Sequence, residues 1–122
     1  MPSSDLYRQN ILELYRNPLN NYEMKGATCK ATESNPLCGD AITVFVREKK
    51  GIIEEISFQG TGCAISQAAA SLATDLAKGK TKKEILAITD EDMVKELGIE
   101  VSYARRKCAL LALETIRKAL KP

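Results

Sequence analysis

The middle of the chain reads AITVFV at residues 41–46, REKKG at 47–51 and IIEEISF at 52–58. The two outer segments are rich in β-branched and aromatic side chains, and the segment between them is polar and ends in glycine. This pattern is typical of a β-hairpin, and it predicts two antiparallel strands joined at Lys49–Gly51. On the second strand, the alternation predicts one shared face made of Ile52, Glu54, Ile56 and Phe58.

The segments on either side of this hairpin have different patterns. Residues 4–16 carry apolar side chains at helical spacing, namely Leu6, Ile11, Leu12 and Tyr15, and predict an amphipathic helix. Pro18 ends that helix, and the polar stretch that follows, to about residue 37, predicts loops and one strand. After the hairpin, ISQAAASLATDLAKG at 65–79 predicts an alanine-rich helix that ends near Gly79.

The last third of the chain predicts helices. TKKEILAI at 81–88 and TDEDMVKEL at 89–97 each begin with a threonine followed three residues later by an acid, and SYARRKCALLALETIRKAL at 102–120 is long enough for a third helix. Strands that precede a run of helices indicate an α+β fold. We therefore expect a small antiparallel sheet of about three strands packed against helices, in a single domain that spans residues 1–122.

Composition excludes several classes of protein. The chain has 122 residues, 44% of them hydrophobic and 28% charged, which is an ordinary globular composition. Its 18 Lys and Arg against 16 Asp and Glu leave a net charge of +2, so nucleic acid is not an expected partner. There is no histidine. The sequence therefore excludes histidine-based triads, HExxH metalloproteases and Cys₂His₂ zinc fingers.

The sequence also bears on location. No apolar run approaches the roughly 20 residues that cross a bilayer, and the first residues, MPSSDLYRQN, lack the features of a secretory signal. We therefore expect a cytoplasmic protein that does not contact a membrane. Under the reducing conditions of that compartment, its four cysteines are candidates for metal or sulfur chemistry rather than for disulfides.

The first of these candidates lies in NPLCGD, residues 35–40. Gly39 lets the backbone turn sharply after Cys38, and Asp40 places a carboxylate two residues from the thiol. Both side chains can therefore reach one ion. Taken singly, each residue also has an ordinary explanation, because Cys38 is suited to a buried position at a strand entry and Asp40 to the capping of a turn.

Cys63 lies in GTGCAIS, residues 60–66, between the hairpin and the alanine-rich helix. The exposed N–H groups and partial positive charge of a helix N-terminus favour a thiolate at this point. Such a position suits a reactive or metal-binding cysteine. A cysteine packed beneath a glycine-rich turn is the alternative explanation.

Cys108 follows Arg105, Arg106 and Lys107 within the last predicted helix. Neighbouring cations lower the pKa of a thiol, which makes Cys108 a third candidate. The alternative explanation is that Cys108 belongs to the apolar stripe of that helix. The spacings of the three cysteines are unlike those of CxxC zinc fingers or ferredoxins. Cys29 has neither a glycine nor an acid beside it, and we expect it to be structural.

Three cysteine motifs in order, NPLCGD, GTGCAIS and ARRKCALLALETI (residues 104–116), resemble those of the U-type iron–sulfur cluster assembly scaffolds, the IscU, SufU and NifU N-terminal group. The similarity covers nearly the whole chain. It includes LYRNPLNN at residues 14–21, which looks like the H-Y-x-N-P-x-N of the family, and AKGKTKKEI at residues 77–85.

The resemblance implies a SufE/NifU-like α+β scaffold that assembles a [2Fe–2S] cluster. The sulfur would come from a cysteine desulfurase, and the cluster would pass to acceptor apoproteins. By position in the motifs, Cys38, Cys63 and Cys108 match the cysteines of the family and Asp40 matches its aspartate. Thiolates suit iron–sulfur clusters, whereas a carboxylate is a harder, poorer ligand that suits a scaffold that must release its cluster.

Two departures from the family pattern keep a second function open. Isc-type members have a histidine before the last cysteine, within L-P-P-V-K-x-H-C, whereas this chain has VSYARRKC at residues 101–108. The Lys107–Cys108 pair resembles Suf-type members, many of which bind zinc and relay persulfide sulfur. Those proteins carry an insertion between the second and third cysteine motifs, and here the interval is as compact as in Isc-type members. The alternative function is therefore a zinc-dependent sulfurtransferase.

Roles and partners follow from the scaffold hypothesis. Cys108 is the expected first acceptor of sulfur, Lys107 is expected to act electrostatically, and Gly39 supplies local flexibility. The first helix, the loop around Cys38 and the lysines of residues 78–83 are candidate surfaces for the desulfurase. Tyr7 and Tyr15 on the first helix are candidates for a homodimer contact.

Overall fold

The computed structural model describes residues 4–36, 39–98 and 101–121, without the side chains of residues 4–7 and 104. Over these ranges the chain forms a three-stranded sheet and five helices. Their bounds, in chain order, are α1 Ser4–Arg16, β1 Cys29–Asn35, β2 Asp40–Lys49, β3 Ile52–Thr61, α2 Ala64–Ala77, α3 Lys82–Leu86, α4 Asp90–Leu97 and α5 Tyr103–Leu120. The α+β fold and each of the predicted elements are confirmed.

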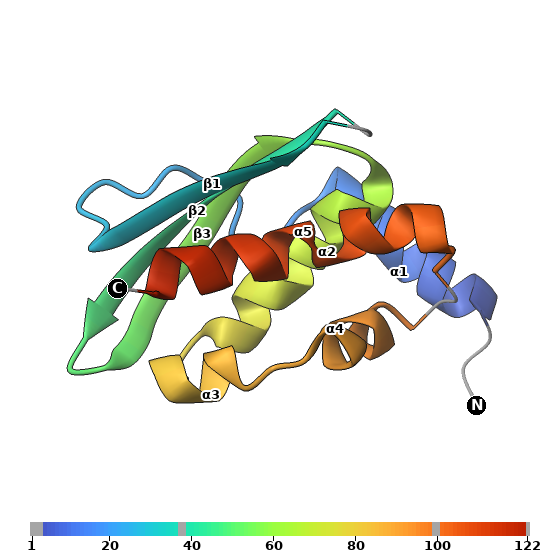
Figure 1. The fold of residues 1–122 in the computed structure, drawn as a ribbon. Helices are drawn as coiled ribbons and strands as arrows, with labels where there is room; N and C mark the ends of the chain where they lie inside the picture. The colour runs from blue at the N-terminus through green and yellow to red at the C-terminus, as the bar shows by residue number, and fades with distance from the viewer. Residues whose placement is uncertain (1–3, 37–38, 99–100, 122) are drawn as a thin grey trace.

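The sheet is antiparallel throughout, in the order β1-β2-β3 (Figure 1). The β2–β3 hairpin closes at Lys50 and Gly51, which both have positive φ, as the twist of a tight hairpin requires. The shared face predicted on β3 is wrong at its start. A bulge opposite Arg47 and Glu48 shifts the alternation, so Ile53 is buried with Ile56 and Phe58, whereas Ile52 is 45% exposed.

Helices α2 and α5 lie together against one face of the sheet, and α3 and α4 lie on the outer side of that helical layer (Figure 1). Alternate residues of β2 point into the space between the layers, where Ile42, Val44 and Val46 are fully buried. Alanines of α2 allow this helix to pack closely against its neighbours. The core therefore lies between the sheet and the α2–α5 pair.

The α1 helix packs against α2 and is fastened by the segment that follows it. The Leu19 N–H donates to Ser71 Oγ at 3.1 Å, and the Asn20 side chain donates to Thr74 Oγ1 at 3.1 Å. The apolar face predicted for this helix is only partly buried, because Ile11 is 5% exposed but Leu12 and Tyr15 are 46% and 50% exposed. The side chains of Leu6 and Tyr7 lie outside the described residues.

Both short helices begin with the capping boxes that their sequences predict. Thr81 and Glu84 exchange hydrogen bonds at the start of α3, and Thr89 and Asp92 do so at the start of α4. The carboxylates receive backbone N–H bonds, which lower the pKa of Glu84 and of Asp92. Among the described residues, no helix has the length and apolar character needed to span a membrane.

Candidate metal centre

Three separate elements bring Asp40, Cys63 and Cys108 together at one end of the sheet. Asp40 is the first residue of β2 and Cys63 directly precedes α2, while Cys108 lies in the second turn of α5. The hairpin register pairs Ala41 with Thr61, so the start of β2 lies beside the chain that leads to Cys63. One ligand atom from each of the three residues lies within 4.8 Å of the other two.

Asp40 is buried although it carries a carboxylate, with only 1% of its surface exposed. Its Oδ1 accepts the N–H of Cys63 at 3.0 Å. Its Oδ2 is buried and has no hydrogen-bond partner among the described residues. Burying a carboxylate oxygen without a partner costs free energy. Coordination of a metal ion by Oδ2 would offset this cost and would explain why the oxygen is buried.

Cys63 occupies the N-cap position of α2, with extended backbone angles. Its carbonyl accepts the Ser66 hydroxyl at 3.0 Å and the Gln67 N–H at 3.1 Å, while its thiol makes no capping bond. The predicted placement at a helix N-terminus is therefore confirmed. The thiol is half-buried, and it lies at the N-terminal end of a 14-residue helix.

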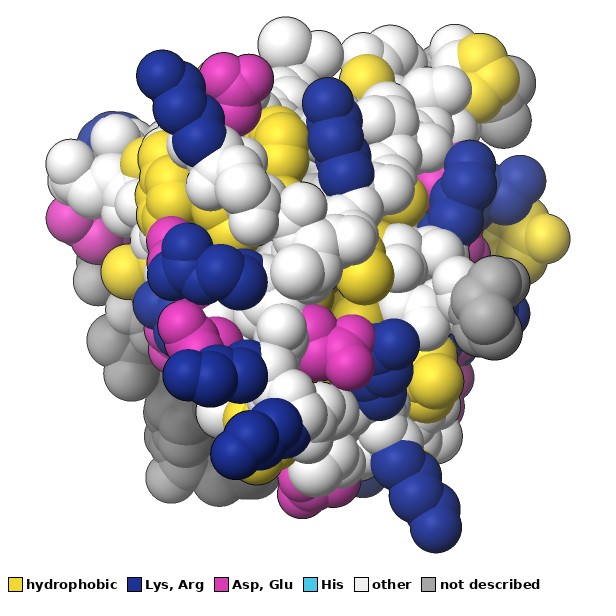
Figure 2. Space-filling model, turned by 90° about the vertical axis from the view of Figure 1, so that its left-hand side faces the viewer, with side chains coloured by type: hydrophobic (Ala, Val, Ile, Leu, Met, Phe, Trp, Pro, Cys, Tyr) yellow, Lys and Arg dark blue, Asp and Glu magenta, His cyan; other side chains and the backbone are white. Residues whose placement is uncertain are grey.

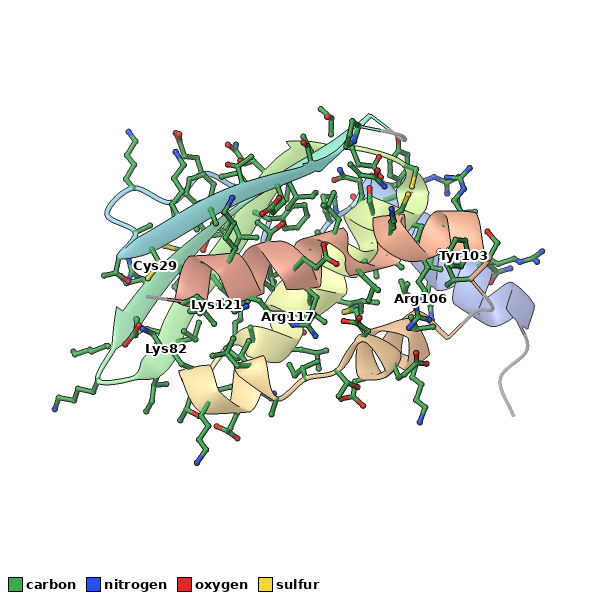
Figure 3. The ribbon with its side chains drawn as sticks, viewed as in Figure 1. Cys29, Lys82, Tyr103, Arg106, Arg117 and Lys121 are labelled. Atoms are coloured by element: carbon green, nitrogen blue, oxygen red, sulfur yellow. The ribbon has the colours of Figure 1, made fainter. Side chains whose placement is uncertain are left out.

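Cys108 is fully buried and lies on the apolar face of α5 with Leu111 and Ile116. The cations that precede it point elsewhere. Arg105 and Lys107 are exposed, and Arg106 forms an ion pair with Glu91 of α4. Figure 3 shows Arg106 directed toward α4 and Tyr103 at the start of α5. Cys108 thus belongs both to the apolar stripe and to the candidate centre, which the sequence left as alternatives.

Cys38 lies outside the described residues, so its position relative to the other ligands is a prediction from the sequence. The residue after it, Gly39, has a φ of +71°, as expected for the sharp turn that precedes Asp40. Lys107 lines a hollow of about 260 Å³ between the end of β1 and α5, together with Pro36.

Cys29 lies at the opposite end of the sheet. In the pairing of β1 with β2, Cys29 faces Val46 whereas Asn35 faces Asp40, and a rise of about 3.3 Å per residue puts these two positions roughly 20 Å apart. Figure 3 shows Cys29 and Lys82 at this far end. Cys29 is half-buried and packs against the core, so it cannot ligate the same ion.

Sequence reasoning missed Gly62, which lies against Asp40, and Ser66, which lies against Gly62 and bonds to the Cys63 carbonyl; neither supplies a ligand. A Cβ atom at Gly62 would lie 2.6 Å from Asp40 Oδ1 and closer still to Ser66 Oγ. GTGCAIS contains both residues. The sequence did not reveal their role, because a glycine beside a turn is usually required for its backbone conformation. At position 62 a glycine is required because there is no space for a side chain.

The donor set determines which ions suit this centre. Cys63 and Cys108 supply soft sulfur ligands, and Asp40 supplies one hard oxygen. Thiolates select zinc, copper(I) and iron–sulfur clusters, whereas a calcium or magnesium site would be built from oxygen ligands. The described residues therefore fit zinc, iron or an iron–sulfur cluster.

Comparison with known proteins places this arrangement in a family. The chain is 36% identical over 115 residues to the iron–sulfur cluster assembly scaffold protein IscU 1 of Archaeoglobus fulgidus, which covers 94% of this chain and 74% of that protein. It is 33% identical over 132 residues to the zinc-dependent sulfurtransferase SufU of Bacillus subtilis, covering 94% and 89% of the two chains.

A solved structure has the same fold. The putative iron–sulfur cluster assembly scaffold protein for the SUF system from Fervidobacterium islandicum superimposes with a TM-score of 0.82 at 29% identity, covering 98% of this chain and all of the other. The model of the NifU-like N-terminal domain matches residues 6–122. The chain therefore belongs to the NifU-like N-terminal domain family.

Proposed function

We propose that this chain is a scaffold on which an iron–sulfur cluster is assembled before it is passed to acceptor apoproteins. The observation that carries the proposal is the convergence of Asp40, Cys63 and Cys108 from three elements, with ligand atoms within 4.8 Å of one another. The names of several relatives support it, because they are called iron–sulfur cluster assembly scaffolds. The sulfur would come from a cysteine desulfurase and the cargo would be a [2Fe–2S] cluster.

In this proposal four side chains hold the cargo. Cys38, Cys63 and Cys108 supply thiolates to iron, and Asp40 supplies its Oδ2 as the fourth ligand. Because carboxylate is a harder ligand than sulfide or thiolate, its bond to cluster iron is the weakest of the four. Gly39 would let the Cys38 segment adjust as the cargo enters and leaves.

Sulfur arrives as a persulfide of the desulfurase. A thiolate of this chain attacks its terminal sulfur, the sulfur–sulfur bond to the desulfurase cysteine breaks, and that cysteine leaves as a thiolate. Cys108 is the proposed acceptor. Because its side chain is fully buried, this step requires the neighbouring segments to open when the desulfurase binds, whereas half-buried Cys63 is reached more easily. Converting the transferred sulfur to sulfide consumes two electrons from a donor.

Two surfaces are proposed for partners. Leu12 and Tyr15 of α1 are exposed, and Leu12 lines a hollow together with Ile65, two residues after Cys63. This face suits contact with the desulfurase or with a second subunit. The second surface is at the other end of the molecule, where lysines of the β2–β3 turn and of the segment after α2 are exposed. Figure 2 shows Lys and Arg side chains spread over this end, which is a second candidate surface for the desulfurase.

The second candidate function is zinc-dependent sulfur transfer. The specific observation in its favour is the convergence of two thiols and one carboxylate, which together with Cys38 suits tetrahedral zinc. One relative is named a zinc-dependent sulfurtransferase. Here the same ligands would hold zinc in the resting protein, and Cys108 would exchange the metal for persulfide sulfur.

One experiment separates the two functions. The protein is purified without oxygen, and its iron, zinc and acid-labile sulfide are measured with its absorption spectrum, before and after incubation with desulfurase, cysteine, a reductant and Fe²⁺. A scaffold would acquire iron, sulfide and visible charge-transfer bands. A sulfurtransferase would keep one zinc, form no cluster and accelerate desulfurase turnover.

Matched variants locate the site in the same experiment. Cys38→Ser, Cys63→Ser and Cys108→Ser are each expected to lose the cluster, and Cys29→Ser is the control that keeps it. Mass spectrometry of the protein after desulfurase treatment identifies the cysteine that carries the added sulfur. A cluster that survives all three site substitutions would contradict the proposed ligand set.

A further inference from the structure

We infer that Gly62 is a positioning residue, whose missing side chain lets the Asp40 carboxylate divide its oxygens between Cys63 and the metal. This inference rests on the proposed function and concerns the same site. It assigns a role to a residue that supplies no ligand atom. Three observations carry it: the space around Gly62, its backbone conformation and the two different environments of the Asp40 oxygens.

The space around Gly62 is already filled. A Cβ atom built on this residue would lie 2.6 Å from Asp40 Oδ1 and 3.0 Å from Asp40 Cγ, and it would also overlap Ser66 Oγ. Real Cβ atoms do not make contacts this short. Any side chain at position 62 therefore displaces the carboxylate, the serine hydroxyl or both.

Backbone conformation does not explain this glycine. Gly39, Gly51 and Gly79 have φ values of +71°, +79° and +77°, which favour glycine, and a Cβ on any of them would meet nothing within 4 Å. Gly62 is the reverse case: it is not among the residues with positive φ, but its surroundings are crowded. The requirement at position 62 is therefore for space next to Asp40.

The position of the carboxylate has a direct consequence for coordination. With Gly62 against it, Oδ1 lies 3.0 Å from the Cys63 nitrogen and accepts that N–H. This hydrogen bond holds the carboxylate against the backbone of a neighbouring ligand, and the buried Oδ2 has no partner in the part of the chain that the structure describes. Asp40 can then offer one oxygen to a metal, at a fixed place relative to the Cys63 thiol. A side chain at position 62 would break this arrangement while leaving all four ligand residues in the chain.

Ser66 provides the matched control. Its hydroxyl donates to the Cys63 carbonyl at 3.0 Å and is the other group against which Gly62 packs. Ser66→Ala removes that hydroxyl without adding any atom near Asp40. If the role of Gly62 is to place the carboxylate, Ser66→Ala leaves metal coordination nearly unchanged and Gly62→Ala does not.

The test uses Co²⁺ as a spectroscopic probe, because its absorption reports the number of thiolate ligands and the geometry of the site. The full-length wild type, Gly62→Ala, Asp40→Ala, Ser66→Ala and the double variant Asp40→Ala/Gly62→Ala are titrated without oxygen. We expect Gly62→Ala to give the visible spectrum of Asp40→Ala, with the thiolate bands retained. We also expect it to bind Co²⁺ about tenfold or more weakly than the wild type, a typical loss for an outer-shell change.

The double variant decides whether Gly62 acts through Asp40. With the carboxylate removed, the remaining short contact of an alanine at position 62 is with the Ser66 hydroxyl, which can rotate away. Gly62→Ala should therefore cause no further loss of Co²⁺ affinity in the Asp40→Ala background. An equal loss in both backgrounds overturns the inference. A wild-type spectrum and affinity for Gly62→Ala overturn it as well.

Folding is checked by circular dichroism and thermal unfolding. If Gly62→Ala alone fails to fold while the double variant folds, the conflict with Asp40 is demonstrated directly, and if neither folds the inference is wrong. The proposed function fails separately: a wild type that binds Co²⁺ as expected but assembles no cluster contradicts the scaffold and leaves the role of Gly62 standing. A wild type that binds no Co²⁺ contradicts both.

Discussion

Gly60 and Gly62 bring the end of β3 against the start of β2, and each does so by lacking a side chain. A Cβ on Gly60 would overlap the Ala41 carbonyl oxygen, which belongs to the neighbouring strand. A Cβ on Gly62 would instead meet the Asp40 carboxylate. Gly60 therefore preserves the pairing of β2 with β3. Gly62 preserves the position of the Asp40 carboxylate, which lies at the start of β2 because of that pairing.

Gly60→Ala is expected to destabilise the fold, because a backbone oxygen cannot move away as a flexible side chain can. We expect a loss of more than about 3 kcal/mol in the free energy of unfolding, at the upper end of overpacking effects. The control is Gly79→Ala, which has a positive φ but open space around it and should cost about 1–2 kcal/mol. Urea unfolding measures both, and equal losses would contradict the argument.

Asp40→Ala is expected to slow the release of the cluster, since it removes the hardest and weakest of the proposed ligands. The measurement is the half-life of transfer from the loaded protein to an apo-ferredoxin. Glu33→Ala, on the neighbouring strand, is the control and should transfer like the wild type. An unchanged half-life for Asp40→Ala would remove the carboxylate from the release step.

At the level of single residues, the sequence indicated candidate ligands but not how the fold presents their side chains. NPLCGD and GTGCAIS indicated Asp40 and Cys63, because glycines and a helix start are local features. The run of cations before Cys108 suggested an electropositive thiol, whereas the helix turns Cys108 into the core and leaves Lys107 exposed. Which face of a helix is buried depends on its tertiary partners, which the local pattern does not contain.

At the level of elements, the sequence predicted the helices and the β2–β3 hairpin from signals within each element, whereas it placed β1 only within a polar, loop-rich stretch. Caps such as Thr81 and Thr89 mark helix starts regardless of the rest of the fold. The burial of Ile53 in place of Ile52 was not predictable in this way, because a bulge is set by the pairing of two strands. The exposure of Leu12 has a similar cause, since α1 packs on α2 along only part of its apolar face.

The capping box of α3 gives a pH-dependent contribution to stability. Backbone and side-chain hydrogen bonds from Thr81 lower the pKa of Glu84 from 4.5, so the carboxylate is stabilised in the folded state. This contribution is fully present above the unfolded pKa and is lost as the pH falls through the lower folded pKa. Glu84→Gln should therefore be less stable than the wild type near pH 7, and the gap should narrow below about pH 4.5.

Urea unfolding between pH 3 and pH 7 measures this gap. The matched control is Glu96→Gln, which changes an exposed glutamate in the last turn of α4, where the helix dipole disfavours a negative charge. This variant should be as stable as the wild type or more stable at pH 7. A gap for Glu84→Gln that stays constant with pH would contradict the assigned role of the carboxylate.

Arg117 fastens α4 and the segment before it to α5. Its guanidinium donates to Asp90 Oδ1 and to the Ile88 carbonyl, both at 2.8 Å, and is partly buried. Arg117→Ala should lose about 1.5–3 kcal/mol, as expected for hydrogen bonds to a charged group. Hydrogen exchange of α4 amides should accelerate. The control is Lys118→Ala, which removes an exposed ion pair with Glu33 and should cost less than about 1 kcal/mol. Equal protection of the α4 amides from exchange in both variants would contradict the role of Arg117 in holding α4 against α5.

At the scale of the whole molecule, the candidate centre connects parts of the chain that fold into different layers. Asp40 belongs to the sheet, Cys63 to the junction between sheet and helices, and Cys108 to the helical layer. Cys29 and the exposed lysines lie at the other end. A metal ion at the centre would therefore link the sheet to the helical layer at this end of the molecule. A metal ion held by residues of one element alone would not link the two layers.

Zinc should consequently stabilise the whole fold, because a site built from three elements does not exist in the unfolded chain. At a free zinc concentration about 100 times the dissociation constant, the gain is about 2.7 kcal/mol, which for a domain of this size corresponds to roughly 10 °C in the unfolding midpoint. Thermal unfolding with and without zinc, and again after addition of a chelator, measures this shift in the midpoint.

Cys29→Ser should keep the full shift, whereas Cys108→Ser should lose most of it and Asp40→Ala part of it. A shift that survives Cys108→Ser would mean that zinc binds elsewhere, and the absence of any shift in the wild type would mean that the three side chains meet without forming a metal site.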